Sequence, residues 1–385
     1  MPMDNHQEIR DAVARLCGEF PAPYWRELDR DRAYPSAFVE KLTESGYLAI
    51  LIPEAYGGSG LGISAAAAVL EEIHKHGCNG AACHAQMYTM GTLLKHGSEQ
   101  QKQFYLPKIA CGELRLQAFA VTEPGSGSNT LALRTSAKRQ ADGRYQINGQ
   151  KVWTSRAEHS DLMLLLARTT PREELTRRTG GLSVFLVDMR NAIGNGLEIR
   201  PIRTLINHAT TEVFFDNLVI PGDSLLGEEG QGFKYILDGM NAERILIASE
   251  CLGDCDWFIN KAVAYANERV VFDRPIGQNQ GIQFPIAQAY LSAQAAGLMR
   301  DRAVELFESG AACGAQANMV KYLASEASWQ AADMCMQTLG GYAFAEEYDV
   351  ERKFRETRLY RTAPISNNLV LSYIAEHVLE LPRSY

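Results

Sequence analysis

The stretch FAVTEPGSGSN, residues Phe119–Asn129, decides how the rest of the chain is interpreted. A short apolar run, Leu116–Val121, ends here at Thr122-Glu123-Pro124 and gives way to Gly-Ser-Gly-Ser. This order predicts a strand that leaves its sheet into a turn rich in backbone N–H groups and hydroxyls. Such a turn approaches a flat or anionic ligand closely, because glycine has no Cβ. By itself the pattern is more often a plain surface turn.

A second predicted strand changes this interpretation. Residues Tyr145–Ser155 read YQINGQKVWTS. Together the two stretches resemble the flavin-binding middle domain of the acyl-CoA dehydrogenase family, where T-E-P-x-x-G-S and K-x-W-I/T-S/T segments enclose one face and edge of FAD. The resemblance covers nearly the whole chain. Ile52–Gly60 is similar to the family's P-x-x-Y-G-G loop, and the run that begins at Ser98 is similar to its last N-terminal helix, with a predicted Ser98–Gln101 capping box.

Length and composition indicate a globular protein of several domains. The 385 residues exceed the roughly 250–300 at which a single core stops growing. A net charge of −8 without blocks of like charge argues against nucleic acids or anionic membranes as partners. The polar N-terminus MPMDNHQEIRD shows no signal peptide, no apolar run reaches ~18 residues, and the eight cysteines form no disulfide-like framework. These features predict a cytoplasmic protein.

Five residues of metal-ligand type lie close together: His74, His76, Cys78, Cys83 and His84. Their spacing fits no zinc pattern. On a helix, His74 and His76 would point about 200° apart. We therefore expect a helix end and a turn here, and no metal.

The pattern of apolar residues divides the chain into three blocks, which predicts an α+β multidomain fold. Residues 1–115 form a helical N-terminal domain, residues 116–228 a β domain, and residues 229–385 a helical C-terminal domain. The predicted N-terminal helices are Ile9–Phe20, Phe38–Ala49, Ser64–His76 and Asn79–His96. A Rossmann arrangement is excluded by this order and by the lack of a G-x-G-x-x-G after a strand.

The middle block should form an antiparallel barrel or sandwich, because no helices connect its strands. Its predicted strands are Leu116–Val121, Tyr145–Trp153, Leu162–Ala167, Leu182–Val187 and Glu212–Leu218. We expect a tight turn at Asn148-Gly149. The last block predicts an antiparallel four-helix bundle. Its predicted helices are Gly232–Val270, Gln283–Ser309, Gln316–Leu339 and Ser366–Leu379. Glu351 and Glu356 belong to a charged, helix-like run for which we expect a solvated face.

The resemblance implies an FAD site whose flavin contacts come from the middle block. Thr122 would bond the pyrimidine edge of the flavin, Trp153 would stack near the ring, and Ser155 would bond N5. Ser128 would lie near the pyrophosphate and the substrate. For Trp153 alone, a buried structural role is the plainer interpretation. Ser155 replaces a common threonine, and Asn129 replaces the family's usual aspartate.

Two further motifs come from the C-terminal block. Arg269–Gln280 resembles R-x-x-F-G-x-P-I-x-x-x-Q, with Asp273 in place of glycine, and Gln337–Gly341 resembles Q-x-x-G-G. The resemblance implies that they bind the adenosine half of FAD from different subunits, so that FAD binding requires an oligomer. The FAD contacts expected in all are Phe119, Thr122, Ser128, Trp153, Ser155, Arg269, Phe272, Gln280, Gln337, Gly341, Ser366 and Asn368.

The family's reaction needs a carboxylate base that removes a proton from Cα of the acyl thioester while hydride leaves Cβ, with its pKa raised by burial. Many members place this glutamate in Y-x-x-Y-E-G-T, where this chain has Pro364. Isovaleryl- and long-chain-type members instead carry it on the long C-terminal helix as E-R, where this chain has Glu243-Arg244. The resemblance therefore implies Glu243 as the base. The alternative is an exposed helix carboxylate paired with Arg244.

Substrate contacts follow from the same resemblance. They are Ser128, Asn241, Arg244 and Ala363, and Cys83–Met90 should lie along the acyl tail. In the family, the backbone N–H at the glutamate position polarises the thioester carbonyl, and Pro364 has no N–H. Either Ile365 or another amide takes this role, or carbonyl activation is weaker.

The implied function is FAD-dependent α,β-dehydrogenation of an acyl-CoA thioester to the trans-2-enoyl-CoA in fatty acid metabolism. An electron-transfer flavoprotein would accept the electrons, and the enzyme would be a homotetramer. The alternatives are an oxidase, a desulfinase or a monooxygenase on the same fold. A catalytically silent, acyl-CoA-binding partner subunit also stays open because of Pro364.

Overall fold

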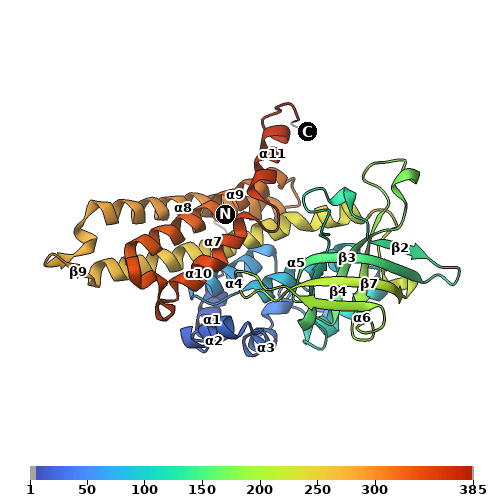
Figure 1. Cartoon of the computed structure of the whole chain (residues 1–385), viewed down its shortest axis with the longest axis horizontal. Helices are drawn as coiled ribbons and strands as arrows, with labels where there is room; N and C mark the ends of the chain where they lie inside the picture. Colours follow the sequence, from blue (N-terminus) through green and yellow to red (C-terminus); the bar gives the residue numbers. More distant parts are fainter. Residues whose placement is uncertain (1–5, 384–385) are drawn as a thin grey trace. The chain divides into compact units, whose positions relative to one another are not determined.

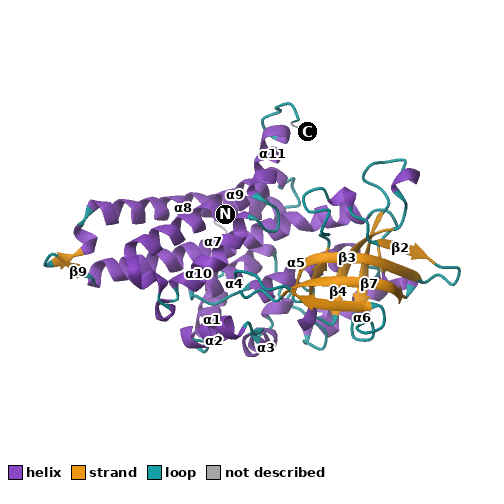
Figure 2. Ribbon diagram, in the orientation of Figure 1, coloured by secondary structure: helices purple, strands orange, loops and turns teal. Residues whose placement is uncertain are grey.

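The computed structural model describes residues 6–383, so the first five residues of the polar N-terminus lie outside the described part. The chain divides into two compact units, each discontinuous in sequence. Unit 1 takes the chain up to Asp31, then Gly62–Gly80 and everything from Asn241 onward, and unit 2 takes Arg32–Leu61 and Ala81–Met240. The large sheet belongs to unit 2, and unit 1 is mainly helical (Figure 2).

The predicted order of helices, then strands, then helices is confirmed. The borders predicted at 115/116 and 228/229 fall in connecting segments, between α6 and β1 and between β8 and α7. The helices of unit 2 are α3 (Ser36–Glu44), α5 (Ala81–His96) and α6 (Glu99–Ala110). The capping box is confirmed, because the Ser98 hydroxyl accepts the Gln101 N–H at 3.2 Å and the Ser98 N–H donates to Gln101 Oε1 at 2.8 Å.

Unit 2 contains an eight-stranded sheet of order β6-β7-β3-β2-β4-β5-β8, with β1 paired to β4. The strands are β1 (Leu116–Ala120), β2 (Ser136–Arg139), β3 (Tyr145–Ser155), β4 (Leu162–Arg168), β5 (Leu182–Asp188), β6 (Leu197–Pro201), β7 (Thr210–Ile220) and β8 (Leu225–Leu226). The sheet is largely antiparallel, as predicted, but β1 runs parallel to β4 and β2 makes one parallel pairing with it. The β2–β3 hairpin lies between β1 and β4 in sequence and gives the chain room to return in the same direction.

The predicted tight turn at Asn148-Gly149 is wrong. Both residues lie inside β3, where Gly149 sits opposite Phe215 of β7 at a register shift. Gly149 has φ 146°, and a Cβ there would lie 2.6 Å from Thr135 Cα. The turn between β2 and β3 instead contains Gly143, at φ 87°. Glycine at position 149 therefore serves a close approach of two backbones, which an Asn-Gly pair in sequence does not distinguish from a turn.

Unit 1 is built from long helices (Figure 1). They are α1 (Gln7–Gly18), α2 (Ala22–Asp31), α4 (Ile63–Lys75), α7 (Gly232–Glu268, which begins in unit 2), α8 (Gln280–Glu308), α9 (Gly314–Leu339), α10 (Val350–Thr357) and α11 (Asn367–His377). A short hairpin, β9 (Val270–Val271) and β10 (Arg274–Pro275), follows α7. No helix in the described part of the chain is both long and apolar enough to cross a membrane.

One core cluster of unit 1 is formed mainly by buried residues of α7, α8 and α9, including Phe258, Ala293 and Ala331, and Val350 of α10 joins it. The predicted fourth helix, α11, packs on α9 and buries Val370. The sequence does not predict α10 as a core element. Helix α10 reads VERKFRET. Most of its residues are charged or polar, so the pattern of apolar residues does not predict that the helix packs in the core.

Glu356 on α10 is buried, so its predicted solvated position is wrong. Arg352 Nη1 donates to Glu356 Oε1 at 2.9 Å, and Lys353 pairs with Glu356 and Asp254. Burial opposes ionisation of Glu356, but the charges of Arg352 and Lys353 hold its pKa below the usual range. Asp254 in turn contacts Nδ1 of His74 at 2.9 Å. The first of the five metal-ligand-type residues thus belongs to this buried charge network at the end of α4.

Candidate functional site

The expected site residues fall into two groups, one in each compact unit. The residues of the T-E-P and K-x-W motifs belong to unit 2, and the expected base, the two adenosine motifs and the segment around Pro364 belong to unit 1. Each group is described by itself.

The T-E-P motif forms a turn that its own hydrogen bonds close. Strand β1 ends at Ala120, and Glu123 and Ser126 then exchange backbone N–H···O bonds of 3.2 and 3.0 Å. The Ser126 hydroxyl donates to the Asn129 carbonyl at 2.6 Å. Ser128 is exposed on this turn, as a ligand-contacting residue must be. The predicted strand followed by a turn is therefore present.

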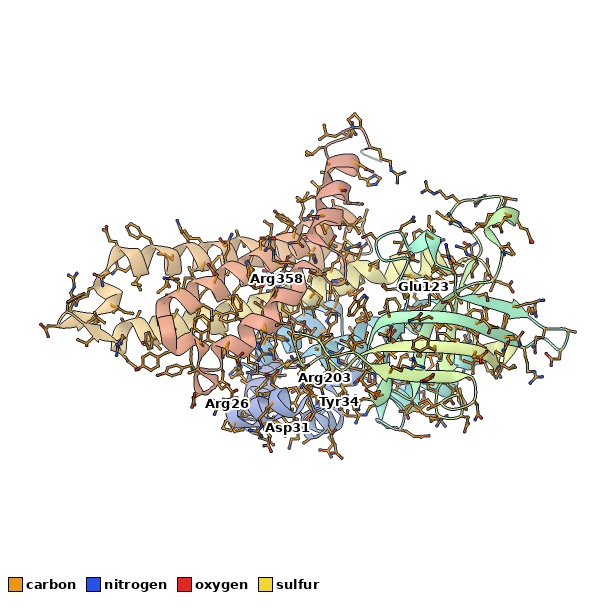
Figure 3. All side chains as sticks on the ribbon, in the orientation of Figure 1. Arg26, Asp31, Tyr34, Glu123, Arg203 and Arg358 are labelled. Carbon is orange, nitrogen blue, oxygen red and sulfur yellow. The ribbon has the colours of Figure 1, made fainter. Side chains whose placement is uncertain are left out.

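A buried ion pair between Glu123 and Lys151 joins the T-E-P and K-x-W segments. Figure 3 labels Glu123 in unit 2. Lys151 Nζ donates to Glu123 Oε1 and to the Val121 carbonyl, both at 2.9 Å. The backbone N–H of Val152 donates to the Thr122 carbonyl at 2.9 Å. Thr122 is thereby fixed relative to the strand that carries Trp153 and Ser155. Glu123 and Lys151 are both fixed letters of the motifs, but their identity in the sequence does not predict this pairing.

Glu123 is an anion in this environment. Its carboxylate also accepts the backbone N–H groups of Arg134 and Thr135, at 2.7 and 2.8 Å. Burial alone would raise the pKa of Glu123, but the Lys151 charge and these hydrogen bonds bring it below the usual range. Burial lowers the pKa of Lys151 to about 8, which the Glu123 charge opposes, so that the pair is ionised at neutral pH.

Trp153 faces outward from the sheet. Its side chain is 58% exposed, its φ is 62°, and the register against β7 shifts between Lys151 and Thr154. The alternative of a buried structural tryptophan is therefore wrong. A positive φ at a bulky residue requires support from its surroundings, and here it turns a large flat ring away from the core. Thr122 and Ser155 are half-buried, and Phe119 packs edge-on against Tyr88 of α5, with ring centroids 5.5 Å apart.

In unit 1, Glu243 lies on α7 and is 7% exposed. The alternative of an exposed helix carboxylate is therefore wrong. The neighbouring Arg244 donates from Nη1 to Asn241 Oδ1 at 2.9 Å. Burial lowers the pKa of Arg244, while the negative charge of Glu243 opposes that shift. Asn241 and Arg244 are thus hydrogen-bonded to each other, and the charge of Glu243 acts on the Arg244 guanidinium.

The segment around Pro364 connects α10 to α11. The N–H groups of Thr362 and Ala363 both donate to the Leu359 carbonyl, at 2.8 and 2.9 Å, and the Ala363–Pro364 peptide bond is cis. Ser366 is the N-cap of α11, and its hydroxyl accepts the Leu369 N–H. Ala363 and Ser366 are half-buried, and Asn368 is exposed. No glutamate occupies this segment, as its sequence already required.

The two adenosine motifs line one pocket of a single chain. This pocket has a volume of about 490 Å³ and is lined by Tyr265, Arg269, Val271, Ile276 and the run Thr338–Tyr342. The Arg269 guanidinium lies 5.8 Å from the centroid of the Tyr342 ring. One chain thus brings Arg269 and Gly341 together. That the two motifs contact FAD from different subunits stays a prediction.

The remaining residues of these motifs are accessible. Phe272 is 93% exposed at the tip of the β9–β10 hairpin, Gln280 begins α8, and both Gln280 and Gln337 are exposed. Asp273 has φ 61°, the left-handed region that the family's usual glycine favours and aspartate tolerates.

These features fit the two ends of FAD separately. In unit 2, an outward-facing indole and half-buried hydroxyls suit a flat, polar-edged ring system. In unit 1, an arginine beside the backbone of Gly340 and Gly341, together with aromatic rings, suits an adenosine with its phosphates.

The sequence matches known protein families over nearly the whole chain. Residues 3–113, 118–218 and 230–379 match, in turn, the models of the N-terminal, middle and C-terminal domains of acyl-CoA dehydrogenases. The acyl-CoA dehydrogenase FadE12 of Mycobacterium tuberculosis is 34% identical over 387 residues, which cover 99% of this chain and 98% of that protein.

Two other proteins show the range of related chemistry. A 3-(aryl)acrylate reductase of Clostridium sporogenes is 29% identical over 98% of this chain and 99% of its own. The solved structure of a glutaryl-coenzyme A dehydrogenase bound to glutaryl-CoA has a TM-score of 0.90 and 29% identity, covering 98% of this chain and 96% of that one.

Proposed function

Because this chain belongs to the acyl-CoA dehydrogenase family, whose members are flavoenzymes that act on CH–CH bonds, we propose that it oxidises an acyl-CoA thioester to the trans-2-enoyl-CoA with Glu243 as the base. The observation that carries this proposal is the burial of Glu243 on α7, in a chain that has proline at the position of the more common base. A carboxylate that is shielded from bulk water and carried on a long helix can be held in one position against a substrate, as a general base must be.

In the proposed reaction, the Glu243 carboxylate takes the proton from the carbon next to the thioester carbonyl. A positioned base of this kind contributes about 10²–10⁴ in rate. Arg244, held by Asn241, lies beside Glu243 in sequence and supplies a permanent positive charge that compensates the buried carboxylate. Ser128, Asn241, Arg244 and Ala363 remain the proposed substrate contacts.

We propose that each chain binds one FAD, which would supply the acceptor for the hydride that leaves the β carbon of the substrate. Phe119, Thr122, Ser128, Trp153 and Ser155 would hold the flavin end. The other contacts are proposed to be Arg269, Phe272, Gln280, Gln337, Gly341, Ser366 and Asn368. The purified protein should be yellow with one FAD per chain. A colourless preparation that FAD does not reconstitute would contradict this.

The test of the base is Glu243→Gln, which preserves the shape of the side chain and removes its basicity. With a good acyl-CoA substrate in anaerobic stopped flow, flavin reduction should fall by at least about 10² while FAD stays bound. Glu113→Gln, an exposed carboxylate before β1, is the matched control and should reduce at the wild-type rate. Reduction of the Glu243→Gln variant at nearly the wild-type rate would make Glu243 a structural residue.

A second variant tests position 364, where this chain has proline in place of the more common glutamate. In the Glu243→Gln background, Pro364→Glu places a carboxylate where most relatives have theirs, and part of the lost reduction should return. In the wild-type background the same change should bring no gain, because the site then holds two carboxylates that repel each other.

We propose an electron-transfer flavoprotein as the electron acceptor. Reduced enzyme should then reoxidise slowly in air and rapidly with that protein. Rapid reoxidation by oxygen would favour the oxidase or monooxygenase alternative, and the absence of flavin reduction with any acyl-CoA would favour a silent acyl-CoA-binding subunit. A desulfinase would release sulfite. Cytoplasmic location and a role in fatty acid metabolism stay predictions.

We also propose a homotetramer. Helix α8 exposes large apolar side chains at Phe284, Leu291 and Leu298, which are seven residues apart and so share one helix face. Such a stripe suits another helix of a second copy of the chain. In this arrangement, one subunit would offer Arg269 and Gly341 together to the FAD of its partner. Light scattering of the yellow protein should give four chains, and a flavin-loaded monomer would contradict the shared site.

A further inference from the structure

Lys321 on α9 is fully buried, and the mechanism proposed above does not use it. Its ammonium group donates to the Ile365 carbonyl at 2.6 Å and to Asn367 Oδ1 at 2.7 Å. Both acceptors lie just after Pro364, in the segment that holds Ala363, Ser366 and Asn368. One buried cation therefore contacts the segment from the inside at two points.

The Asn367 side chain extends this attachment. Its Nδ2 donates to Glu326 Oε1 at 2.7 Å and to the Ser325 hydroxyl at 3.1 Å, and both acceptors are on α9. Arg361 Nε also donates to Glu326 Oε1, at 2.8 Å. The connection between α10 and α11 is thus tied to one turn of α9 by charged and amide groups.

Because the peptide group is planar, the hydrogen bond between Lys321 and the Ile365 carbonyl also fixes the direction of the Ser366 N–H. Among the described residues, the cis peptide bond is Ala363–Pro364, so the bond between Ile365 and Ser366 is trans. In a trans peptide the C=O and the following N–H point in opposite directions. Because the Ile365 carbonyl points at Lys321, the Ser366 N–H points away from Lys321 and from the interior of α9.

The amide so directed has no acceptor within the described part of the chain. The hydrogen bonds of residues 6–383 include none donated by the backbone N–H of Ile365 or Ser366. The N–H of Ala363, in contrast, is used by the Leu359 carbonyl, and Pro364 has none. Ser366 also begins α11, where the helix dipole favours a negatively charged acceptor.

A purely structural role explains Lys321 poorly. An ammonium group loses its hydration on burial, and an apolar side chain would fill the same space without that cost. Among the groups that act on its charge, Glu326 on α9 favours the ammonium form, while Arg361 before Pro364 and Arg244 on α7 oppose it. Burial accordingly lowers the pKa of Lys321 to about 8.

We propose that Lys321 is a positioning residue, which holds the Ile365 carbonyl and the Asn367 amide so that the Ser366 N–H is aimed at an oxygen atom of a bound ligand. That oxygen belongs either to a phosphate of the cofactor or to the thioester carbonyl of the substrate. In the second case Ser366 supplies the donor that Pro364 lacks. The inference rests on the proposed function for the identity of these ligands, and on geometry alone for the orientation.

The test is Lys321→Met, with Lys261→Met on α7 as the matched control. Hydrogen exchange of the apoprotein measures how firmly the segment after Pro364 is held, through the protection of its backbone amides. In Lys321→Met, protection of the Ala363, Leu369 and Val370 amides should fall at least tenfold, while the Ala331 amide in the middle of α9 keeps its protection. Lys261→Met should leave all four unchanged. Unchanged protection of the segment in Lys321→Met would overturn the proposal.

Two measurements separate the two oxygen sources. If the ligand is a cofactor phosphate, the Kd of the Lys321→Met apoprotein for FAD should rise at least tenfold. If it is the thioester carbonyl, FAD should bind normally, and flavin reduction at saturating acyl-CoA should fall at least tenfold. Normal values of both would also overturn the proposal, whatever the exchange result.

If Lys321→Met does not fold, Asn367→Leu provides a second variant for the same measurements. This variant removes one of the two acceptors and no charge, so the same effects should follow with smaller size, and their absence would overturn the proposal. The proposed function fails separately. If no acyl-CoA reduces the flavin of the wild-type protein, the proposed dehydrogenase function is wrong. The hydrogen-exchange and FAD-binding measurements would still test the proposed role of Lys321.

Discussion

Two fully buried lysines, Lys151 in unit 2 and Lys321 in unit 1, hold loops in different ways. Lys151 joins the T-E-P turn to β3 through the carboxylate of Glu123 and the Val121 carbonyl. Lys321 holds the segment after Pro364 through a carbonyl and a carboxamide, both uncharged. Burial lowers the pKa of each lysine to about 8.

The partners decide what each lysine contributes. An ion pair such as Lys151–Glu123 is costly to break, because removal of one member leaves a buried charge without compensation. A lysine with neutral acceptors has no such dependent charge, so its removal costs little stability and mainly frees the groups that it orients. Lys151 is therefore expected to matter most for folding, and Lys321 most for the alignment of the site.

The largest expected effect on stability is that of Lys151→Met. It leaves Glu123 buried without a counter-charge, and breaking such a pair costs about 3–5 kcal/mol. Urea denaturation followed by fluorescence should show this loss. The double variant Lys151→Met/Glu123→Gln should recover part of it, because the uncompensated charge is gone. A loss below about 1 kcal/mol in Lys151→Met would remove the distinction between the two lysines.

A smaller effect on stability is expected for Lys321→Met. Two buried acceptors lose their donor, at about 1–3 kcal/mol, but the cost of burying an ammonium group disappears as well. The net change in the free energy of unfolding should therefore stay within about 1 kcal/mol of the wild type. The same urea titrations measure it. A loss as large as that of Lys151→Met would contradict the comparison.

The pH dependence of stability should differ between the two regions. The folded-state pKa of Glu123 is lowered, so its contribution is present above the unfolded-state pKa of about 4.5 and is lost as pH falls through the folded-state value. The stability advantage of the wild type over Glu123→Gln should therefore shrink below about pH 4.5, by up to about 1.4 kcal/mol per pH unit. Thermal denaturation at pH 7, 5 and 4 measures this. The difference between the wild type and Lys321→Met should stay constant over that range, because Lys321 is fully protonated throughout.

The smallest effect on stability is expected for Trp153→Ala. The exposed indole contributes little to the core, so the free energy of unfolding of the apoprotein should change by less than about 0.5 kcal/mol. Its FAD affinity should nevertheless fall about two- to tenfold, because a stacked aromatic surface contributes on the order of 0.5–1.5 kcal/mol. Fluorescence titration with FAD measures the affinity. A large loss of stability without a loss of affinity would restore the structural role of this tryptophan.

Local patterns predicted most of the elements of this fold. The capping box at Ser98, the long helix beginning at Gly232 and the strand–turn at Thr122 occur where their sequence signals lie. The errors have one common cause. Gly149 and helix α10 are governed by residues distant in sequence, namely Thr135 and the core of α7–α9. A local window contains neither the backbone that excludes a Cβ nor the helices against which α10 packs.

The sequence by itself determined the family, the flavin motifs and the replacement of the common base by Pro364, because these depend on residue identity at fixed spacing. Only the tertiary structure decided that Glu243 is buried, that Trp153 faces outward, and that Arg269 and Gly341 share one pocket. It also revealed Lys151 and Lys321, whose acceptors lie 28 to 46 residues away along the chain. The sequence does not show whether a lysine is solvated or buried. Its burial depends on which groups, distant in sequence, replace the water around its ammonium group.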